Sequence, residues 1–276
     1  MAIVQMQRIN ICALKKNRKA ILERLQELGA MEIDIQLEDD NLGEKQDVAS
    51  SRALFERRAQ TADQALAILN IYVPEKKGML DSLAGKPLVE KELFEKAAEN
   101  QDQYMATASR IVTLDKQIAE SKAAVLKVQN QVEALAPWLS LTVPVSYTGT
   151  QKTAVLIGTM PNPQDQQSIL NLLAGAVPDV EAVDVELIST DKDFTYLAVI
   201  CMKQDAGKVE EVLRTGGFSK PSSPVQKIPE EYKKDLEAEI AKAQEQAKQL
   251  ESELAECAGS RQDLELISDY YRTRAE

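Results

Sequence analysis

Residues 88–136 read LVEKELFEKAAENQDQYMATASRIVTLDKQIAESKAAVLKVQNQVEALA and contain neither glycine nor proline. From Tyr104 onward, apolar and small side chains recur at alternating steps of three and four residues. This spacing places them on one stripe of a continuous helix, which is the pattern of a coiled coil. The stripe consists of Tyr104, Thr107, Ile111, Leu114, Ile118, Ser121, Val125, Val128, Val132 and Leu135.

A second stretch can supply the partner that such a stripe needs. Residues 229–276 contain no proline after Pro229 and a single glycine, Gly259. We therefore expect a long antiparallel helical hairpin in which 229–276 is the return helix and residues 137–228 form a small distal lobe at the tip. The second stripe consists of Leu236, Ile240, Ala243, Ala247, Leu250, Leu254 and Cys257.

The N-terminal residues predict another small lobe. Ile3–Ala13 and Met31–Leu37 alternate in apolar character, as half-buried strands do. Between them, Lys16–Leu28 has the apolar spacing of a helix, and Gly29 can supply a left-handed C-cap. Two strands and one helix bury too little surface to be stable alone, so we expect this proximal α/β lobe, residues 1–44, to be incomplete.

Residues 45–136 are expected to lead out from the proximal lobe as helices, with a break at 74–87 where glycines and prolines cluster. The first of these helices covers about Gln46 to Val73. If the two hairpin stretches pair over their full lengths, this first helix has no partner within the 276 residues. Together with the lack of a stop signal after Tyr270, this favours a fragment of a longer protein.

The distal lobe, residues 137–228, contains short apolar segments separated by turn residues. The expected order is strand, strand, helix, strand, strand, helix, which suggests an antiparallel or mixed sheet with both helices on one face. The chain is therefore assigned to the α+β class. The expected elements are strands Leu139–Tyr147 and Thr153–Thr159, a helix from Pro161 to Leu173, strands Val180–Ile188 and Thr195–Cys201, and a helix at Ala206–Leu213.

The charge balance favours a basic protein surface over nucleic acid as a partner. The formal net charge is -11, with 28% charged and only 4% aromatic residues. A surface of this sign repels phosphate backbones. Residues 229–276 carry thirteen acidic and seven basic side chains, a net of -6, so more than half of the excess lies on the return helix. The simpler interpretation of this acidity is a solvated helix face.

Few residues are suited to catalysis. The chain lacks histidine, the commonest general base and metal ligand. Cys12, Cys201 and Cys257 have no metal-ligand spacing and are expected to be small buried apolar groups in a reducing compartment. No apolar run reaches the ~18 residues that cross a bilayer, and the first residues lack a signal-peptide pattern. We expect a soluble, cytoplasmic, non-enzymatic chain without catalytic, metal-binding or cofactor-binding residues.

Four local patterns have a functional interpretation that is weaker than the structural one. Glu38–Asp40 could bind a cation but lacks the ligand spacing of a calcium loop, so a solvated turn is favoured. Gly85–Lys86 resembles part of a phosphate-binding loop, but Pro87 stands where Ser or Thr should hold magnesium. Gly216–Gly217 is better explained as a helix cap. Trp138 is better explained as a packing anchor at the junction of hairpin and lobe.

Five short segments carry a resemblance to a known family. They are MAIVQM at 1–6, INICAL at 9–14, AILERLQELG at 20–29, MEI at 31–33 and TAVLIGTMP at 153–161. These segments resemble subunit I of bacterial and archaeal V/A-type rotary ATPases, the counterpart of eukaryotic subunit a. The first four are similar to its N-terminus, and the fifth is similar to the strand that enters its distal lobe. None of them is a catalytic motif.

The resemblance implies an arm on the cytoplasmic face of the cell membrane. In this family a proximal and a distal lobe, joined by a long helical hairpin, dock the peripheral stalks that keep the catalytic head from turning with the rotor. The membrane domain that carries the ion half-channels and an essential arginine is absent from these 276 residues, so no residue role is carried over. The implied function is the stator arm of a proton- or sodium-translocating ATPase, with the peripheral-stalk heterodimer as partner and its docking residues unknown.

Two other classes remain open. A free-standing coiled-coil tether or scaffold would use the same hairpin without any ATPase. A regulatory module that senses a small molecule is possible, because strand-helix-strand units such as 3–37 occur in ligand-binding α+β domains. An enzyme comes last, since the sequence offers no pair of nucleophile and base.

Overall fold

The chain forms two units in the computed structural model, Met1–Val48 and Ala49–Glu276. The structure describes residues 6–7, 9, 11–29, 31–32, 48–75, 89–222 and 224–275. In the first unit, a short 3-10 turn leads into helix α1, Arg18–Leu28. The helix ends at Gly29, whose φ of 58° is the left-handed conformation that glycine adopts without steric cost. The expected helix and its cap are confirmed.

The strands expected in the first unit are not found among its described residues. Met6, Gln7, Ile9 and 11–13 form no strand, and neither do Met31 and Glu32. The remaining residues of both expected strands lie outside the described ranges. A strand forms only where a neighbour satisfies its backbone groups, and alternating side chains alone do not provide that neighbour. No residue of α1 is buried.

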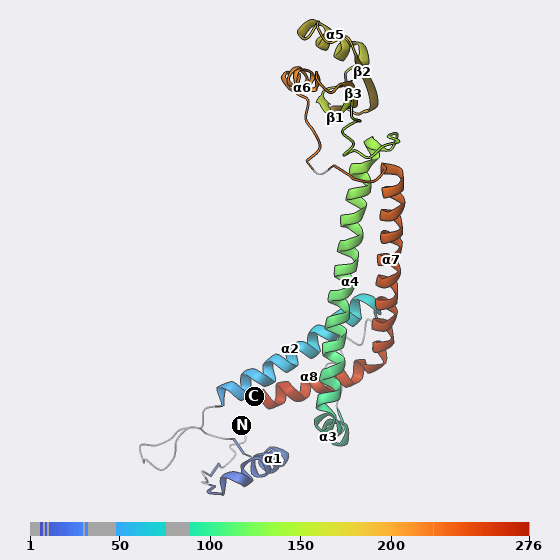
Figure 1. The fold of residues 1–276 in the computed structure, drawn as a ribbon. Helices are drawn as coiled ribbons and strands as arrows, with labels where there is room; N and C mark the ends of the chain where they lie inside the picture. The colour runs from blue at the N-terminus through green and yellow to red at the C-terminus, as the bar shows by residue number, and fades with distance from the viewer. Residues whose placement is uncertain are drawn as a thin grey trace, which may run out of the picture. The chain divides into compact units, whose positions relative to one another are not determined.

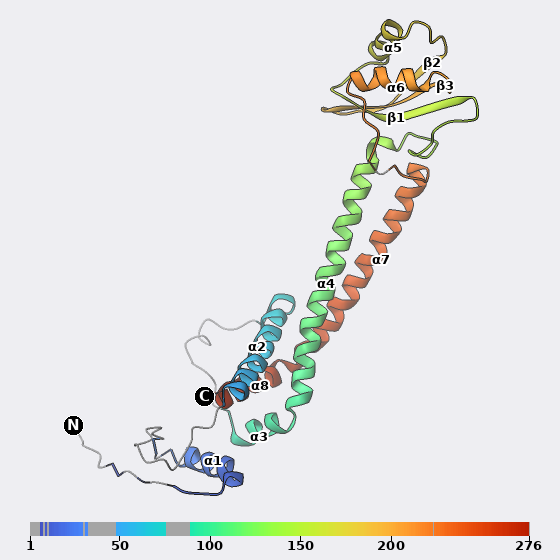
Figure 2. The same ribbon diagram turned by 60° about the vertical axis from the view of Figure 1, so that its left-hand side comes forward.

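The helical part of the second unit consists of two pairs. Figure 1 and Figure 2 both show α4 beside α7 and α2 beside α8. Because α4 runs toward the distal lobe and α7 runs away from it, the first pair is antiparallel. All residues expected on the two stripes are buried or partly buried, which confirms both stripes. The helices are α2, Ala49–Tyr72; α3, Lys91–Glu99; α4, Gln101–Leu135; α7, Pro229–Glu256; and α8, Arg261–Ala275.

The expectation of one uninterrupted helix from Leu88 to Ala136 is wrong, because the chain turns at Asn100 between α3 and α4. The Asn100 side chain donates a hydrogen bond to the carbonyl of Lys96 at 3.1 Å, and so does its backbone N–H at 3.0 Å. Asparagine stabilises helix ends by such local bonds. The turn brings the Phe94 ring to 5.5 Å from that of Tyr270 in α8.

The expectation of a single return helix, 229–276, is also wrong. Helix α7 ends at Glu256, a 3-10 turn covers Cys257–Ser260, and α8 begins at Arg261. The turn directs α8 along α2 instead of α4 (Figure 1). Helix α2 therefore has a partner within the chain, contrary to the expectation that it lacked one. The small residues of the turn, which include Gly259, permit this change of direction.

Two apolar clusters form where these helices meet. The first joins α2, α4, α7 and α8, and the second joins α2 to α8. The largest fully buried side chain is Tyr271, whose hydroxyl donates to Gln101 at 3.1 Å and accepts from Arg58 at 2.8 Å. The clusters consist of Ala65, Ile68, Leu69, Ala108, Ile111, Leu114, Ile118, Leu254 and Leu264, and of Ala59, Ala62, Ile267 and Tyr271.

A buried arginine fixes the turn between α7 and α8 to the end of α2. The guanidinium of Arg261 donates to the carbonyl of Val73 at 2.6 Å and to the side-chain oxygen of Asn70. Its Nε lies 3.1 Å from a carboxylate oxygen of Glu75. The planar fork of arginine can serve three acceptors at once, and the carbonyl of Val73 is one that a helix end leaves without an intrahelical partner.

The distal lobe contains a three-stranded antiparallel sheet of order β1-β3-β2, with helices α5 and α6. Both helices share one apolar core with the sheet, which includes Ile169, Val209 and Leu197, so they cover the same face as expected. With this sheet the chain is α+β. The elements are β1, Thr153–Pro161; α5, Gln166–Ala176; β2, Val183–Thr190; β3, Phe194–Met202; and α6, Ala206–Thr215.

The expected first strand of the lobe, Leu139–Tyr147, is wrong. This segment is an irregular run of turns and bends, and Pro144 in its middle lacks the N–H that a ladder requires. Its apolar side chains cover the second face of the sheet instead. Leu141 and Val145 are buried there in one cluster with Ile157. The observed order is therefore strand, helix, strand, strand, helix.

We predict that Arg261→Met lowers the free energy of unfolding by about 2 kcal/mol, because it removes the hydrogen bonds that this buried, charged side chain donates to Asn70 and to the carbonyl of Val73. Arg261→Lys should recover little of this, since one ammonium group cannot reach three acceptors. Urea unfolding followed by circular dichroism measures both changes.

The matched control is Lys116→Met, which removes an exposed ion pair with Glu120 at 3.8 Å. It should change the free energy by less than about 0.5 kcal/mol. Equal effects of the substitutions at 261 and 116 would contradict a structural role for the buried guanidinium.

Candidate functional site

The structure accounts for two of the four local patterns. Gly216 and Gly217 cap α6: the amide of Gly217 donates to the carbonyl of Arg214 at 3.0 Å, and φ of Gly217 is 91°. A Cβ at Gly217 would lie 2.8 Å from the ring of Pro161, so close packing explains this glycine without a ligand. Glu38–Asp40 and Gly85–Lys86 lie outside the described residues.

Trp138 is a packing anchor, as expected. It is buried, and its ring meets that of Tyr196 in β3 edge-on at a centroid distance of 5.1 Å. Beside it, the hydroxyl of Ser189 in β2 donates to the carbonyl of Pro137 at 2.8 Å. The segment that follows α4 is therefore attached to the sheet of the distal lobe by an aromatic contact and by two hydrogen bonds, the second from the hydroxyl of Ser140 to the carbonyl of Ile188 at 3.1 Å.

The cysteines of the described ranges lie in the core or at the surface and not in a common site. Cys201 is buried as expected, and burial raises the pKa of its thiol, whereas Cys12 is exposed, contrary to expectation. Within the described ranges, no three Cys, Asp or Glu side chains gather in an arrangement that could hold a metal ion. None of the helices that the structure describes is long and apolar enough to cross a bilayer.

Both edges of the distal-lobe sheet are partly occupied, which matters for any docking partner. Beside β1, the backbones of Thr159 and Ser219 exchange two hydrogen bonds of 2.9 Å. On β2, the carbonyl of Val185 accepts from the side chain of Gln166 at 2.6 Å, and its N–H donates to Asp184 at 2.9 Å. Side chains that bind edge groups discourage the addition of another strand. A partner would therefore contact side chains on the lobe, not a bare edge.

The outer side of α5 is the best candidate for such a contact. Residues 166–178 contain no charged side chain, although 28% of the whole chain is charged. Leu172 and Ala174 are exposed on this helix, and nothing lies within 4 Å of the position that a Cβ of Gly175 would occupy. An exposed uncharged helix face on a highly charged protein is therefore a candidate contact surface. The sequence alone led to no prediction of partner-binding residues, although the absence of charge at 166–178 could have suggested this contact.

The N-terminus of α5 is well defined. The carboxylate of Asp165 accepts a hydrogen bond of 2.7 Å from the amide of Ser168, and the bonds from Ser168 hold the pKa of Asp165 below its usual range. This is an N-cap, which satisfies an amide that the helix leaves free. Helix α5 is therefore presented as a fixed element and not as a frayed one.

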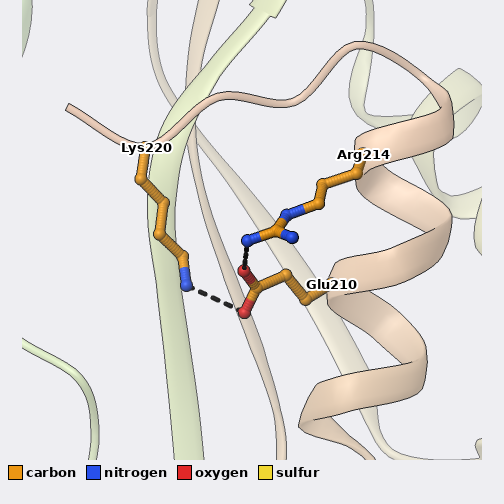
Figure 3. Close-up of polar contacts among 3 residues, drawn as sticks. All are labelled: Glu210, Arg214 and Lys220. Atoms are coloured by element: carbon orange, nitrogen blue, oxygen red, sulfur yellow. Dashed lines mark hydrogen bonds and ion pairs between the residues drawn. The ribbon is translucent and has the colours of Figure 1, made fainter. Parts of the chain in front are cut away.

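The second helix of the lobe has a different surface. Glu210 on α6 accepts hydrogen bonds from Lys220 at 2.8 Å and from Arg214 at 2.7 Å (Figure 3). The bond from Lys220 is the main cause that lowers the pKa of the Glu210 carboxyl. These ion pairs tie the segment after α6 to the helix and leave a charged, hydrated surface there, in contrast to α5.

The hairpin between β2 and β3 carries an exposed aromatic ring on a rigid turn. Phe194 is 44% exposed. The carboxylate of Asp191 accepts from the amides of Asp193 and Phe194 at 2.8 and 2.7 Å, and from the hydroxyl of Tyr196 at 2.9 Å. The bonds from these two amides, that of Asp193 first, lower the pKa of Asp191. An aromatic side chain on a fixed turn is a second candidate contact of the lobe.

No protein-family model and no curated protein matches the chain. The solved structures that match it include the crystal structure of the cytoplasmic N-terminal domain of subunit I, a homolog of subunit a, of V-ATPase. The alignment covers 94% of this chain and 82% of that chain, with 19% sequence identity and a TM-score of 0.47. This is the family that the short sequence segments resemble.

We predict that Asp191 stabilises the distal lobe at neutral pH and that this stabilisation is lost in acid. Because the pKa of its carboxyl is lower in the folded state, its contribution is present above the unfolded pKa of about 3.9 and is lost as the pH falls through the lower folded value. Asp191→Asn should therefore flatten the decline of melting temperature below about pH 4.

Melting curves from pH 6 to acid, followed by near-ultraviolet circular dichroism of Trp138, measure this dependence. The control is Asp179→Asn, an exposed aspartate that follows α5. An identical acid decline in the Asp191→Asn variant and the native chain would contradict the assigned hydrogen bonds.

Proposed function

We propose that this chain is the cytoplasmic stator arm of a proton- or sodium-translocating V/A-type rotary ATPase. Its lobes would dock the peripheral-stalk heterodimer, and the helical hairpin would link that dock to the membrane domain of the same subunit. In this proposal residues 1–44 belong to the proximal lobe, 45–136 to the outgoing helices, 137–228 to the distal lobe and 229–276 to the return segment. The arm itself is not catalytic.

The main support is the way in which a self-contained lobe is inserted between two antiparallel helices. The strand Thr153–Pro161, which carries one of the family-like segments, is β1 of that lobe. Two packed helices resist bending better than one, because each would have to slide along the apolar stripe of the other. A lobe fixed to the end of α4 through Trp138 can therefore transmit force along the pair. This coiled-coil role of α4 and α7 is part of the proposal.

The surface of the lobe fits docking better than chemistry. The polar clusters described above are caps, turns and ion pairs between elements, and each has an evident structural purpose. Helix α5 offers an uncharged contact face, and the chain as a whole is acidic, with a net charge of -11. A partner with an apolar contact surrounded by basic groups would be complementary to both features.

The test is a calorimetric titration of the chain with the peripheral-stalk heterodimer from the same source at two salt concentrations. We expect saturable binding that weakens as salt rises, because charge complementarity is screened. Leu172→Gln, at a side chain that is 36% exposed on α5, should weaken binding about ten-fold while the distal lobe stays folded. The matched control is Ile71→Gln, an exposed apolar residue on α2.

Absence of binding by a chain with a folded distal lobe would contradict the proposal and favour a tether unrelated to rotary ATPases. Equal effects of the substitutions at 172 and 71 would reject α5 as the contact while leaving the stator role intact. Heat released instead on addition of amino acids or nucleotides would favour the small-molecule sensor.

A further inference from the structure

A groove lies between α4 and α7, away from the distal lobe. Its volume is about 560 Å³. The apolar side chains that line it are Val125 and Leu126 of α4 and Ala247 of α7, and the amino groups of Lys122 and Lys248 stand at its rim. A groove of this size can receive two or three side chains of another molecule.

Small residues on the two stripes explain why the groove is there. Ser121 on α4 and Ala243 and Ala247 on α7 occupy positions where a coiled coil usually places large apolar side chains. Toward the helical junction, the fully buried Ile118 closes the space between the two helices. Large side chains hold α4 and α7 apart on both sides of this position. The small side chains between them do not fill the resulting gap.

Leu126 does not contribute to the packing between α4 and α7. Its side chain lies off the stripe of α4, and 62% of it is exposed, although it adjoins the apolar groove. Covering such a side chain would remove apolar surface from water at no cost to the hairpin. The next large apolar residues of α4, Val125 and Val128, are at least partly buried by α7.

The groove is locally basic in an acidic protein. The residues that line it include two lysines, Lys122 and Lys248, and one glutamate, Glu251, a net charge of +1, whereas the whole chain carries -11. Lys122 is paired with Glu251 at 2.7 Å. Lys248 has no ion-pair partner among the residues that the structure describes. An anionic partner is therefore favoured at this position, and only a partner that is also apolar would fill the groove.

We propose that this groove binds an acidic amphipathic helix of a partner protein. Leucine-like side chains of that helix enter between Val125 and Ala247 and cover Leu126, while its carboxylates meet Lys248. This is the helix-in-groove mode, in which apolar side chains at helical spacing anchor the ligand. The site is separate from the proposed stalk contact on α5 and does not depend on it.

A second copy of this chain does not have the matching surface. Neither α7 nor α8 exposes a large apolar side chain. These acidic helices of a second copy could therefore pair with the lysines but could not fill the apolar groove. Helix α1 exposes Leu22 and Leu28, but it carries three basic and two acidic side chains and so lacks an acidic face. On α2 and α3 the exposed leucines, Leu54 and Leu93, stand singly. The occupant that fits both the apolar floor and the basic rim is a helix with leucines on one side and glutamates on the other.

Fluorescence anisotropy of a labelled synthetic helix tests this. The probe is a peptide of about 18 residues, roughly five turns, with leucines at steps of three and four and glutamates elsewhere. Two control peptides replace every glutamate by lysine or scramble the leucines. We expect saturable binding of the acidic amphipathic peptide to the full chain, at least ten-fold weaker binding of both controls, and loss of affinity with rising salt.

Four variants locate the site. Leu126→Gln should weaken binding about ten-fold and Lys248→Glu about five-fold. Their matched controls are Ile71→Gln on α2 and Lys208→Glu on α6, both exposed and outside the groove, and these should bind like the native chain. Melting temperatures within about 2 °C of the native value would show that all four fold.

Several results would overturn the proposal. They are absence of saturable binding, equal affinity for the lysine peptide, or variants at 126 and 248 that bind like the native chain. Sedimentation of the chain alone is run in parallel. A dimer that Leu126→Gln dissociates would assign the groove to contact between copies, and displacement of the peptide by oleate at a similar concentration would assign it to a fatty acid.

Discussion

The packing of one apolar stripe determines the arrangement of the second unit. Helix α4 has 35 residues and a single stripe, and it can bury that stripe only against other helices. Along most of its length α7 covers it, and near its N-terminus α2 and α8 cover it. Ile111 and Ile118 are fully buried as a result. The antiparallel course of α7 in turn places both ends of the distal lobe at one end of the pair.

Polar contacts then fix where the helices change direction. Apolar stripes hold helices together but tolerate sliding, whereas the three bonds of Arg261 allow one position of the α7–α8 turn relative to α2. A similar contact lies further along α8, where Asp63 accepts from Ser268 and from Arg272, each at 2.6 Å. Buried and half-buried hydrogen bonds thus give the junction a specific geometry that the stripe alone does not define.

The sequence predicted the elements whose cause is local. The stripes of α4 and α7 and the cap at Gly29 follow from spacing and residue type, and they are present. The sequence did not predict the break at Asn100 or the turn at 257–260, although Gly259 is a turn signal. Both are stabilised by contacts with residues far away in the chain. Helix α3 packs on Tyr270, and α8 packs along α2. The irregular segment 139–147 was missed because apolar alternation was given more weight than Pro144.

The surfaces proposed for binding were also readable in part. The charge-free run at 166–178 and the small residues Ser121, Ala243 and Ala247 stand in the sequence. What the sequence could not show is exposure: whether Leu172 faces solvent depends on how α5 seats on the sheet, and whether small residues leave a groove depends on the register of α4 against α7. Both are properties of long-range packing.

The central functional claim is that the arm is held stationary by a peripheral stalk. The most direct test is electron cryo-microscopy of the intact ATPase from the same source, with the rotational states of the head separated. If the proposed function is correct, the distal lobe contacts a peripheral stalk through α5 in every state. A lobe that touches no stalk, or that turns with the rotor from one state to the next, would contradict it.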